Sequence, residues 1–414
     1  MGSHALRTPL VVVAGGTAPA AAIGVERVIG RIRAEEPGTA VVHHDLRDVR
    51  NGVVHRRLRF GTADERRILT LAHGCVSCTL REDVLPLMRE LGRRPEVRRI
   101  VLHLDPALDP ESACWAVRHV AVDGRPVTDT VDLRGVVTAL DPGSWLDDAT
   151  GDRGLARAGL ADLPDEERTL AQLVVAQAEF ADVLLLAGPA EPWELARTTA
   201  VLARLNPRAQ RVLTPGREVL LDALPPGARR GRAAGPHDPL LAGEPPLEPA
   251  AGVQLVTFTA RRPFHPDRLH AAVDVLLDGV VRARGRIWLA TRPDTVLWLE
   301  SAGGGLEIGR SGQWLAAGGW EAATPERLAE ANLRWHPRWG DRVQELAILV
   351  HDGDPATIKA ALRAALLDDG EVAAGDDAWR ALPDPFGRHH TDPCGDIAPA
   401  PAIPRDDPTR EEWN

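Results

Sequence analysis

The feature that most constrains the fold is a series of short, uninterrupted apolar segments that alternate with helical patterns in the first half of the chain. Segment 10–14 is followed by a glycine pair and then by apolar residues at helical spacing over 20–33. Strands that are apolar on both faces need cover on both sides, which is typical of a mainly parallel sheet. The pattern predicts a doubly wound α/β domain, with a helix over 166–180, strands at 10–14, 40–44, 100–104, 131–140 and 183–186, and an edge-like strand at 67–72.

The second half of the chain has a different pattern. Residues 215–252 contain Pro-Gly and Pro-Pro pairs with little periodicity, which indicates a linker between a first domain at 8–214 and a second domain. Residues 253–368 predict that this second domain is a small α+β domain with an antiparallel sheet. Its expected strands are 253–259, 285–290, 296–301 and 344–351, and its expected helices are 266–277 and 355–367. The acidic, proline-rich remainder, 369–414, predicts a loosely held tail.

Composition limits the classes of function. The chain has 414 residues, a formal net charge of −10 and four cysteines. This charge disfavours broad binding of DNA or other nucleic acid, and so few cysteines favour a reducing, cytoplasmic location over a disulfide framework. No segment approaches the roughly 20 apolar residues of a membrane helix, so no membrane association is expected.

Two of the four cysteines lie in one turn. The segment Gly-Cys-Val-Ser-Cys-Thr-Leu-Arg-Glu-Asp, residues 74–83, places Cys75 and Cys78 immediately before a helical pattern, and Thr79 with Glu82 is spaced as a capping box. A helix N-terminus favours thiolate over thiol, and a thiolate pair binds soft metals. The alternative is a tight turn in which two small cysteines are only half-buried.

Several motifs together carry a resemblance. A strand with a glycine turn at the N-terminus, the Gly-Cys-x-x-Cys-Thr-Leu-Arg-Glu-Asp segment, Phe-Ala-Asp at 180–182, Leu-Asn-Pro at 205–207 and a second domain resemble the CobW-type family of P-loop metallochaperone GTPases. The resemblance implies a P-loop NTPase-like first domain, a CobW C-terminal domain and zinc at the cysteine segment, where Ser77 replaces a family cysteine. His103 takes the place of a metal-proximal glutamate, so the expected zinc ligands are Cys75, Cys78 and His103, with His73 as a substitute.

The nucleotide motifs of the family are degenerate in this chain. At the P-loop position stand Gly15, Gly16 and Thr17, followed by Pro19, with neither a lysine for the phosphates nor a hydroxyl for magnesium. The switch segment reads His-Leu-Asp-Pro-Ala-Leu-Asp-Pro at 103–110, and the guanine-reading segment reads Ala-Gly-Pro-Ala at 187–190. We therefore expect neither GTP binding nor hydrolysis, and no catalytic residue.

Further motifs are similar to an actinobacterial subgroup of the family that recruits a ribosome hibernation factor, namely segments 72–83, 263–268 and 285–293. The subgroup implies a non-hydrolysing adaptor of the zinc-limitation response, with the hibernation factor or the ribosome as partner and zinc as a sensed ligand. The alternative is a GTP-dependent zinc metallochaperone. A third, a zinc hydrolase on the same three ligands, would need a general base such as Asp105.

Three other groups have two interpretations each. Cys114 is expected in the core. His389, His390 and Cys394 are either a second metal site or a solvated cluster. The tryptophans of the second domain and the arginines between them either form a contact face for protein or RNA or divide into core and solvated surface; they are Trp288, Trp298, Trp314, Trp320, Trp335, Trp339, Arg282, Arg284, Arg286, Arg292, Arg334 and Arg338.

Overall fold

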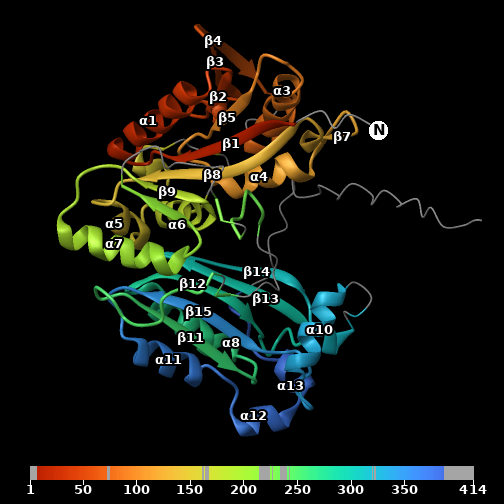
Figure 1. Cartoon of the computed structure of the whole chain (residues 1–414). Helices are drawn as coiled ribbons and strands as arrows, with labels where there is room; N and C mark the ends of the chain where they lie inside the picture. The colour runs from red at the N-terminus through yellow and green to blue at the C-terminus, as the bar shows by residue number, and fades with distance from the viewer. Residues whose placement is uncertain are drawn as a thin grey trace, which may run out of the picture.

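The computed structural model describes residues 7–71, 75–160, 163, 167–213, 224–225, 227–233, 240–241, 243–318, 320 and 323–386. Two domains follow each other along the chain and pack against each other (Figure 1). Among the described residues, no helix combines the length and the apolar character that a membrane span requires. The expected cluster of His389, His390 and Cys394 lies outside the described residues.

The first domain is built on an eight-stranded sheet in the order β10-β9-β8-β1-β5-β2-β3-β4. The six strands from β10 to β2 are parallel to one another. At one edge β3 is antiparallel to β2 and forms an antiparallel hairpin with β4. The predicted parallel sheet is confirmed. Its strands are β1 (Thr8–Gly15), β2 (Thr39–Asp45), β3 (Val53–Phe60), β4 (Ala63–Thr70), β5 (Arg99–His103), β8 (Val131–Leu140), β9 (Val183–Leu186) and β10 (Gln210–Val212).

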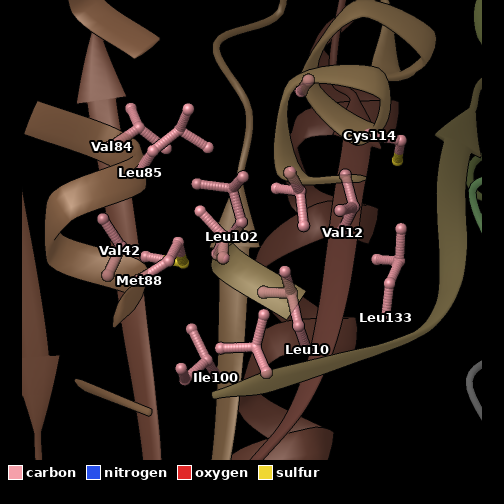
Figure 2. Packing of buried hydrophobic residues seen from close by; sticks show 14 of the residues in the cluster. Leu10, Val12, Val42, Val84, Leu85, Met88, Ile100, Leu102, Cys114 and Leu133 are labelled. Atoms are coloured by element: carbon pink, nitrogen blue, oxygen red, sulfur yellow. The ribbon is translucent and has the colours of Figure 1, made fainter. Parts of the chain in front are cut away.

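Helices cover both faces of this sheet, as its apolar strands require. On one face α1 packs Val25, Val28 and Ile29 against the strands. On the other face lie α3 and α4; Figure 2 shows Leu85 and Met88 of α3 beside Val42 and Leu102, with Cys114 in the same core, as predicted. The helices of this domain are α1 (Pro19–Glu35), α2 (Val76–Thr79), a π-helix (Leu80–Val84), α3 (Leu85–Leu91), α4 (Pro110–His119), α5 (Trp145–Thr150), α6 (Leu170–Phe180) and α7 (Pro192–Leu205). A short hairpin, β6 (Ala121–Val122) with β7 (Arg125–Pro126), follows α4.

The second domain has an antiparallel five-stranded sheet in the order β11-β15-β12-β13-β14, as the α+β pattern predicts. One face packs on α8, α9 and α11, and the other faces α5, α6 and α7 of the first domain (Figure 1). Its strands are β11 (Gln254–Ala260), β12 (Val280–Ile287), β13 (Thr295–Ala302), β14 (Gly305–Gln313) and β15 (Gln344–Val350). Its helices are α8 (Pro266–Ala271), α9 (Val273–Leu277), α10 (Pro325–Arg334), α11 (Pro355–Ala364), α12 (Asp369–Ala374) and α13 (Asp376–Arg380).

Two expected strands are present with shifted bounds, and one expectation is wrong. The strand expected at 285–290 is β12, which begins at Val280, because Arg282, Arg284 and Arg286 continue the strand as ion-paired rather than apolar residues. The edge strand expected at 67–72 is β4, displaced toward the N-terminus and paired with the charged strand β3. The loosely held tail expected from 369 is wrong for residues 369–386, because α12 and α13 pack on the domain through buried Val372 and Trp379.

Candidate functional site

The cysteine turn follows β4 at the edge of the sheet where the parallel strands end. Cys75 has extended backbone angles and caps α2, and its Sγ accepts a hydrogen bond from the backbone N–H of Cys78 at 3.3 Å. Both cysteines are half-buried. The expected capping box of Thr79 is wrong, because Thr79 is itself helical and buried, and its hydroxyl donates to the carbonyl of Cys75.

A π-helix joins this turn to α3 and directs Asp83 back to the sheet. One oxygen of Asp83 lies 2.7 Å from Nε2 of His44 at the end of β2, and the other accepts from Arg56 of β3 at 2.6 Å. Burial alone would raise the pKa of Asp83, but the hydrogen bond from His44 and the charge of Arg56 outweigh it and lower that pKa. Single turns of π-helix frequently mark functional sites. The cysteine turn is thus anchored to two strands through one carboxylate.

His44 is neutral in this arrangement. Burial lowers its pKa, and this effect outweighs the opposite influence of Asp83. A neutral ring that donates Nε2–H to Asp83 presents the lone pair of Nδ1, and that Nδ1 is buried without a hydrogen-bond partner among the described residues. In metal sites, a carboxylate that accepts one ring N–H in this way is the usual outer support of a histidine ligand.

His103 is the predicted third zinc ligand. The register of β2 and β5 aligns it with His43, and the two rings stack with centroids 4.3 Å apart. Burial, with the nearby charges of His43 and Arg59, lowers the pKa of His103 to about 3, so the ring is neutral. Its Nδ1 lies 4.0 Å from Oε1 of Glu26 in α1.

The structure does not gather the predicted ligand set. Among the described residues, no three His, Cys, Asp or Glu side chains lie close enough together to hold a metal ion. His103 therefore does not join Cys75 and Cys78, because its ring is held in the stack with His43. His73, the expected substitute, lies outside the described residues and remains a prediction. The turn itself supplies two sulfur ligands, which fit zinc chemically but form only part of a four-ligand site.

The switch segment after β5 is fixed by hydrogen bonds. Asp105 is buried and accepts from the N–H groups of Leu46 and Ala107, both at 2.9 Å. Burial raises the pKa of Asp105 in spite of these bonds. Because both oxygens are engaged by backbone, Asp105 does not serve the hydrolase alternative as a free general base.

The P-loop position is a short connection. β1 ends at Gly15 and α1 begins at Pro19, so only Gly16, Thr17 and Ala18 lie between them. Gly15 has φ of +97°, and a Cβ there would lie 2.0 Å from the carbonyl oxygen of Ala139. The last residue of β1, at the start of this connection, is therefore packed directly against β8. A P-loop uses a longer glycine-rich segment whose N–H groups surround the phosphates.

The guanine-reading position is also closed. Ala187 packs on Gly24 of α1, where a Cβ would come within 2.5 Å. A Cβ at Gly188 would lie 2.8 Å from Oδ1 of Asp141 and 2.9 Å from Cβ of Ala20. Gly188, in the loop after β9, thus lies between Ala20 in the first turn of α1 and the carboxylate of Asp141, which follows β8. Negative charge at this place opposes a bound phosphate.

A buried ion cluster joins the two domains and was missed from the sequence. Glu179 of α6 is paired with Arg284 and lies 3.0 Å from Arg282, both on β12. Burial would raise the pKa of Glu179, but the charges of Arg284 and Arg282 lower it. Two residues earlier, Gln177 donates to the carbonyls of Pro106 and Leu108 in the switch segment. Helix α6 therefore contacts both the switch segment and the second domain. A single charged residue in the mostly apolar 170–180 helix is the signal that could have revealed it.

The tryptophans divide between core and surface. Trp288 and Trp314 are buried, whereas Trp320 and Trp335 are exposed, with ring centroids 5.5 Å apart. Leu333, two residues before Trp335, is 87% exposed. The arginines of β12 are not a solvated face, since they form the buried pairs described above and a further pair of Arg286 with Glu345.

A nucleotide-binding type of α/β domain followed by an antiparallel domain that packs on it defines a two-domain class of protein. The chain belongs to the CobW family: residues 29–212 match the CobW/HypB/UreG nucleotide-binding domain, and residues 253–366 match the cobalamin synthesis protein cobW C-terminal domain. The first match begins inside α1, after the short β1–α1 connection.

Two relatives have informative names. The zinc chaperone Rv0106 of Mycobacterium tuberculosis (strain ATCC 25618 / H37Rv) is 46% identical over 416 residues, covering 95% of this chain and 96% of the relative. The zinc-regulated GTPase metalloprotein activator 1 of Dictyostelium discoideum is 25% identical over 333 residues, covering 77% and 70%. A solved structure, the Zn(II)-bound YjiA GTPase from E. coli, has 13% identity and a TM-score of 0.36 over 88% of this chain and 100% of that one, which is too distant for a comparison of sites.

Proposed function

We propose that this protein is a zinc chaperone that carries Zn²⁺ as cargo on Cys75 and Cys78 and passes it to a client protein. The observation that carries the proposal is the half-buried cysteine pair, held in place by Asp83, with an incomplete ligand set among the described residues. The names of the two relatives support zinc as the cargo. The chaperone role is thus preferred to the adaptor role that the sequence favoured.

An incomplete site suits transfer. Structural zinc sites are closed by four protein ligands, whereas sites with fewer protein ligands keep positions open. Two sulfurs from the turn leave room for His73, for water or for ligands of the client. A client that supplies further thiolates then displaces the weaker ligands stepwise.

Zinc titration against a chromogenic chelator tests the proposal. The wild-type chain is expected to bind one zinc ion, and Cys75→Ser or Cys78→Ser to weaken binding at least about tenfold, or ~1.4 kcal/mol. Cys114→Ser is the matched control, because Cys114 is buried in the core away from the turn and should leave the affinity unchanged. Equal affinity in all four proteins would exclude the site.

We further propose that zinc handling does not use GTP hydrolysis. Three features support this: the short connection between β1 and α1, the packing of the loop after β9 on α1, and the absence of lysine from the first domain, since the chain's lysine is Lys359. Calorimetry with GTP and Mg²⁺ on the zinc-loaded protein is expected to give no binding heat. Turnover of GTP would restore the GTP-dependent form of the chaperone.

A second candidate is the adaptor that brings a hibernation factor to ribosomes. The observation that favours it is the exposed apolar group of Trp320, Leu333 and Trp335 on the second domain. Co-sedimentation with 70S ribosomes, with and without chelator, tests it, and Trp335→Ser is expected to reduce association if this surface is used. Absence of the protein from the ribosome pellet in both conditions would remove the candidate.

A further inference from the structure

The two sulfurs of the cysteine turn have a second chemistry that does not need a metal. Cys75 and Cys78 lie three residues apart in one turn, and the N–H of Cys78 is donated to the sulfur of Cys75. Because Cys75 is the N-cap of α2 and Cys78 lies in its first turn, helix geometry places their Cα atoms about 5 Å apart, which lies within the separation of about 4.4–6.8 Å found across disulfides. Both are half-buried and therefore reachable by small reagents.

We propose that Cys75 and Cys78 form a redox-active dithiol, which exchanges with low-molecular-weight disulfides and closes to an intramolecular disulfide. A Cys-x-x-Cys pair with this arrangement is the usual framework of thiol–disulfide exchange. Cys114 differs in both respects: it is fully buried, and burial raises its pKa, so it is not expected to react.

The two cysteines have different roles in this reaction. Cys75 is the attacking sulfur, because it accepts the backbone N–H that supports negative charge. Cys78 packs on an apolar cluster that includes Leu71 and Ala107, and it is the resolving sulfur.

The chemistry balances with a disulfide as the oxidant. The Cys75 thiolate attacks one sulfur of the small disulfide, whose S–S bond breaks, and one small thiolate leaves with the electron pair. Cys78 then loses its proton and attacks the Cys75 sulfur, and the second small thiolate leaves. In total the protein gives up two protons and two electrons, and the oxidant becomes two thiols.

Zinc and the disulfide use the same sulfurs and therefore exclude each other. Sulfurs joined in a disulfide are no longer thiolates and do not ligate zinc. The redox reaction itself is independent of zinc binding, because it is defined for the metal-free chain. A failure of zinc binding would leave the redox-active dithiol standing, and the reverse also holds.

The test uses the full chain with Cys114→Ser and Cys394→Ser, so that only the pair remains. The zinc-free protein is equilibrated in mixtures of reduced and oxidised glutathione, then alkylated and weighed by mass spectrometry. We expect a mass loss of two hydrogens and complete protection from alkylation as the mixture becomes oxidising. Stoichiometric zinc is expected to slow this change at least about tenfold, because bound thiolates are poor nucleophiles.

Single variants separate the roles. In the same background, Cys78→Ser is expected to accumulate a glutathione adduct on Cys75, and Cys75→Ser to form an adduct on Cys78 at least about tenfold more slowly. Adducts without an intramolecular disulfide in the parent protein would overturn the dithiol. Equal adduct rates in the two variants would overturn the assignment of Cys75 as the attacking sulfur.

Discussion

Two loops at the same edge of the first sheet are built in opposite ways. The cysteine turn is held in place by contacts that do not involve the cysteines themselves. These are the contacts of the Asp83 carboxylate with His44 and Arg56. The β1–α1 connection is held by direct packing, with Gly15 against the backbone of β8. The first arrangement leaves two sulfurs accessible, whereas the second leaves no cradle for a phosphate.

The contrast shows which chemistry each loop retains. Metal transfer needs ligands that are positioned but not closed in, and a remote anchor supplies this. Phosphate binding needs several free N–H groups facing one point, and a short, packed loop does not provide them. In this chain two half-buried sulfurs lie at this edge, while the β1–α1 connection is only three residues long and follows a glycine packed on β8.

The largest effect is expected from Gly15→Ala. The new methyl group would meet the carbonyl of Ala139 at 2.0 Å with φ of +97°, so β1 must shift from β8. We expect a loss of about 4 kcal/mol in the free energy of unfolding, measured with urea. Gly30→Ala is the matched control, since Gly30 lies in α1 with nothing within 4 Å, and it should stabilise by about 0.5–1 kcal/mol. If Gly15→Ala and Gly30→Ala changed the free energy of unfolding by similar amounts, Gly15 would not be tightly packed against β8.

Asp83→Asn tests the anchor of the cysteine turn. The change leaves Arg56, which is only 10% exposed, without an anionic partner. We expect about 3 kcal/mol of destabilisation, together with weaker zinc binding because the turn loses its support. Asp64→Asn breaks the more exposed pair with Arg57 and should cost less than about 1 kcal/mol. Unchanged zinc affinity in Asp83→Asn would mean that the turn keeps its shape without the anchor.

The histidine stack predicts a pH dependence of stability. The pKa of His103 falls from 6.5 to about 3 on folding, so this neutral ring contributes fully above pH 6.5 and its contribution is lost as pH falls toward 3. Between pH 7 and pH 5 the loss from this group is about 2 kcal/mol, since the unfolded chain takes up the proton. Urea unfolding at the two pH values measures it. His103→Gln should lose less stability over this interval, and an identical loss would place the titration elsewhere.

The fold was largely predictable because the parallel strands are buried on both faces and therefore appear as apolar runs. The hairpin of β3 and β4 was not, since its residues are charged and β4 is exposed along nearly its whole length. The helices α12 and α13 were also missed. Their composition is acidic, and they are held on the domain by the burial of Val372 and Trp379 and by the ion pair of Glu371 with Arg268.

The candidate site was predictable only where it is local in sequence. The spacing of Cys75 and Cys78 indicated the turn, but the anchor joins His44 to Asp83 across 39 residues, and nothing in either segment specifies that contact. The helix cap moved from Thr79 to Cys75 because a sulfur occupies the capping position. A contact between strand end and helix depends on the register of the sheet, which becomes known only with the structure.

The smallest expected effect is the change in the free energy of unfolding when each loop is offered its ligand, zinc for the cysteine turn and GTP for the β1–α1 connection. Zinc at about ten times its dissociation constant should add ~1.4 kcal/mol to the free energy of unfolding, and millimolar GTP with Mg²⁺ should add nothing measurable. Thermal unfolding of the same sample with each ligand makes the comparison. In Cys75→Ser the stabilisation by zinc should be lost, and nothing else should change. Stabilisation by GTP would require a cation other than lysine to neutralise the phosphates and would require the β1–α1 connection to open away from Ala139. The two loops would then differ in stiffness rather than in chemistry.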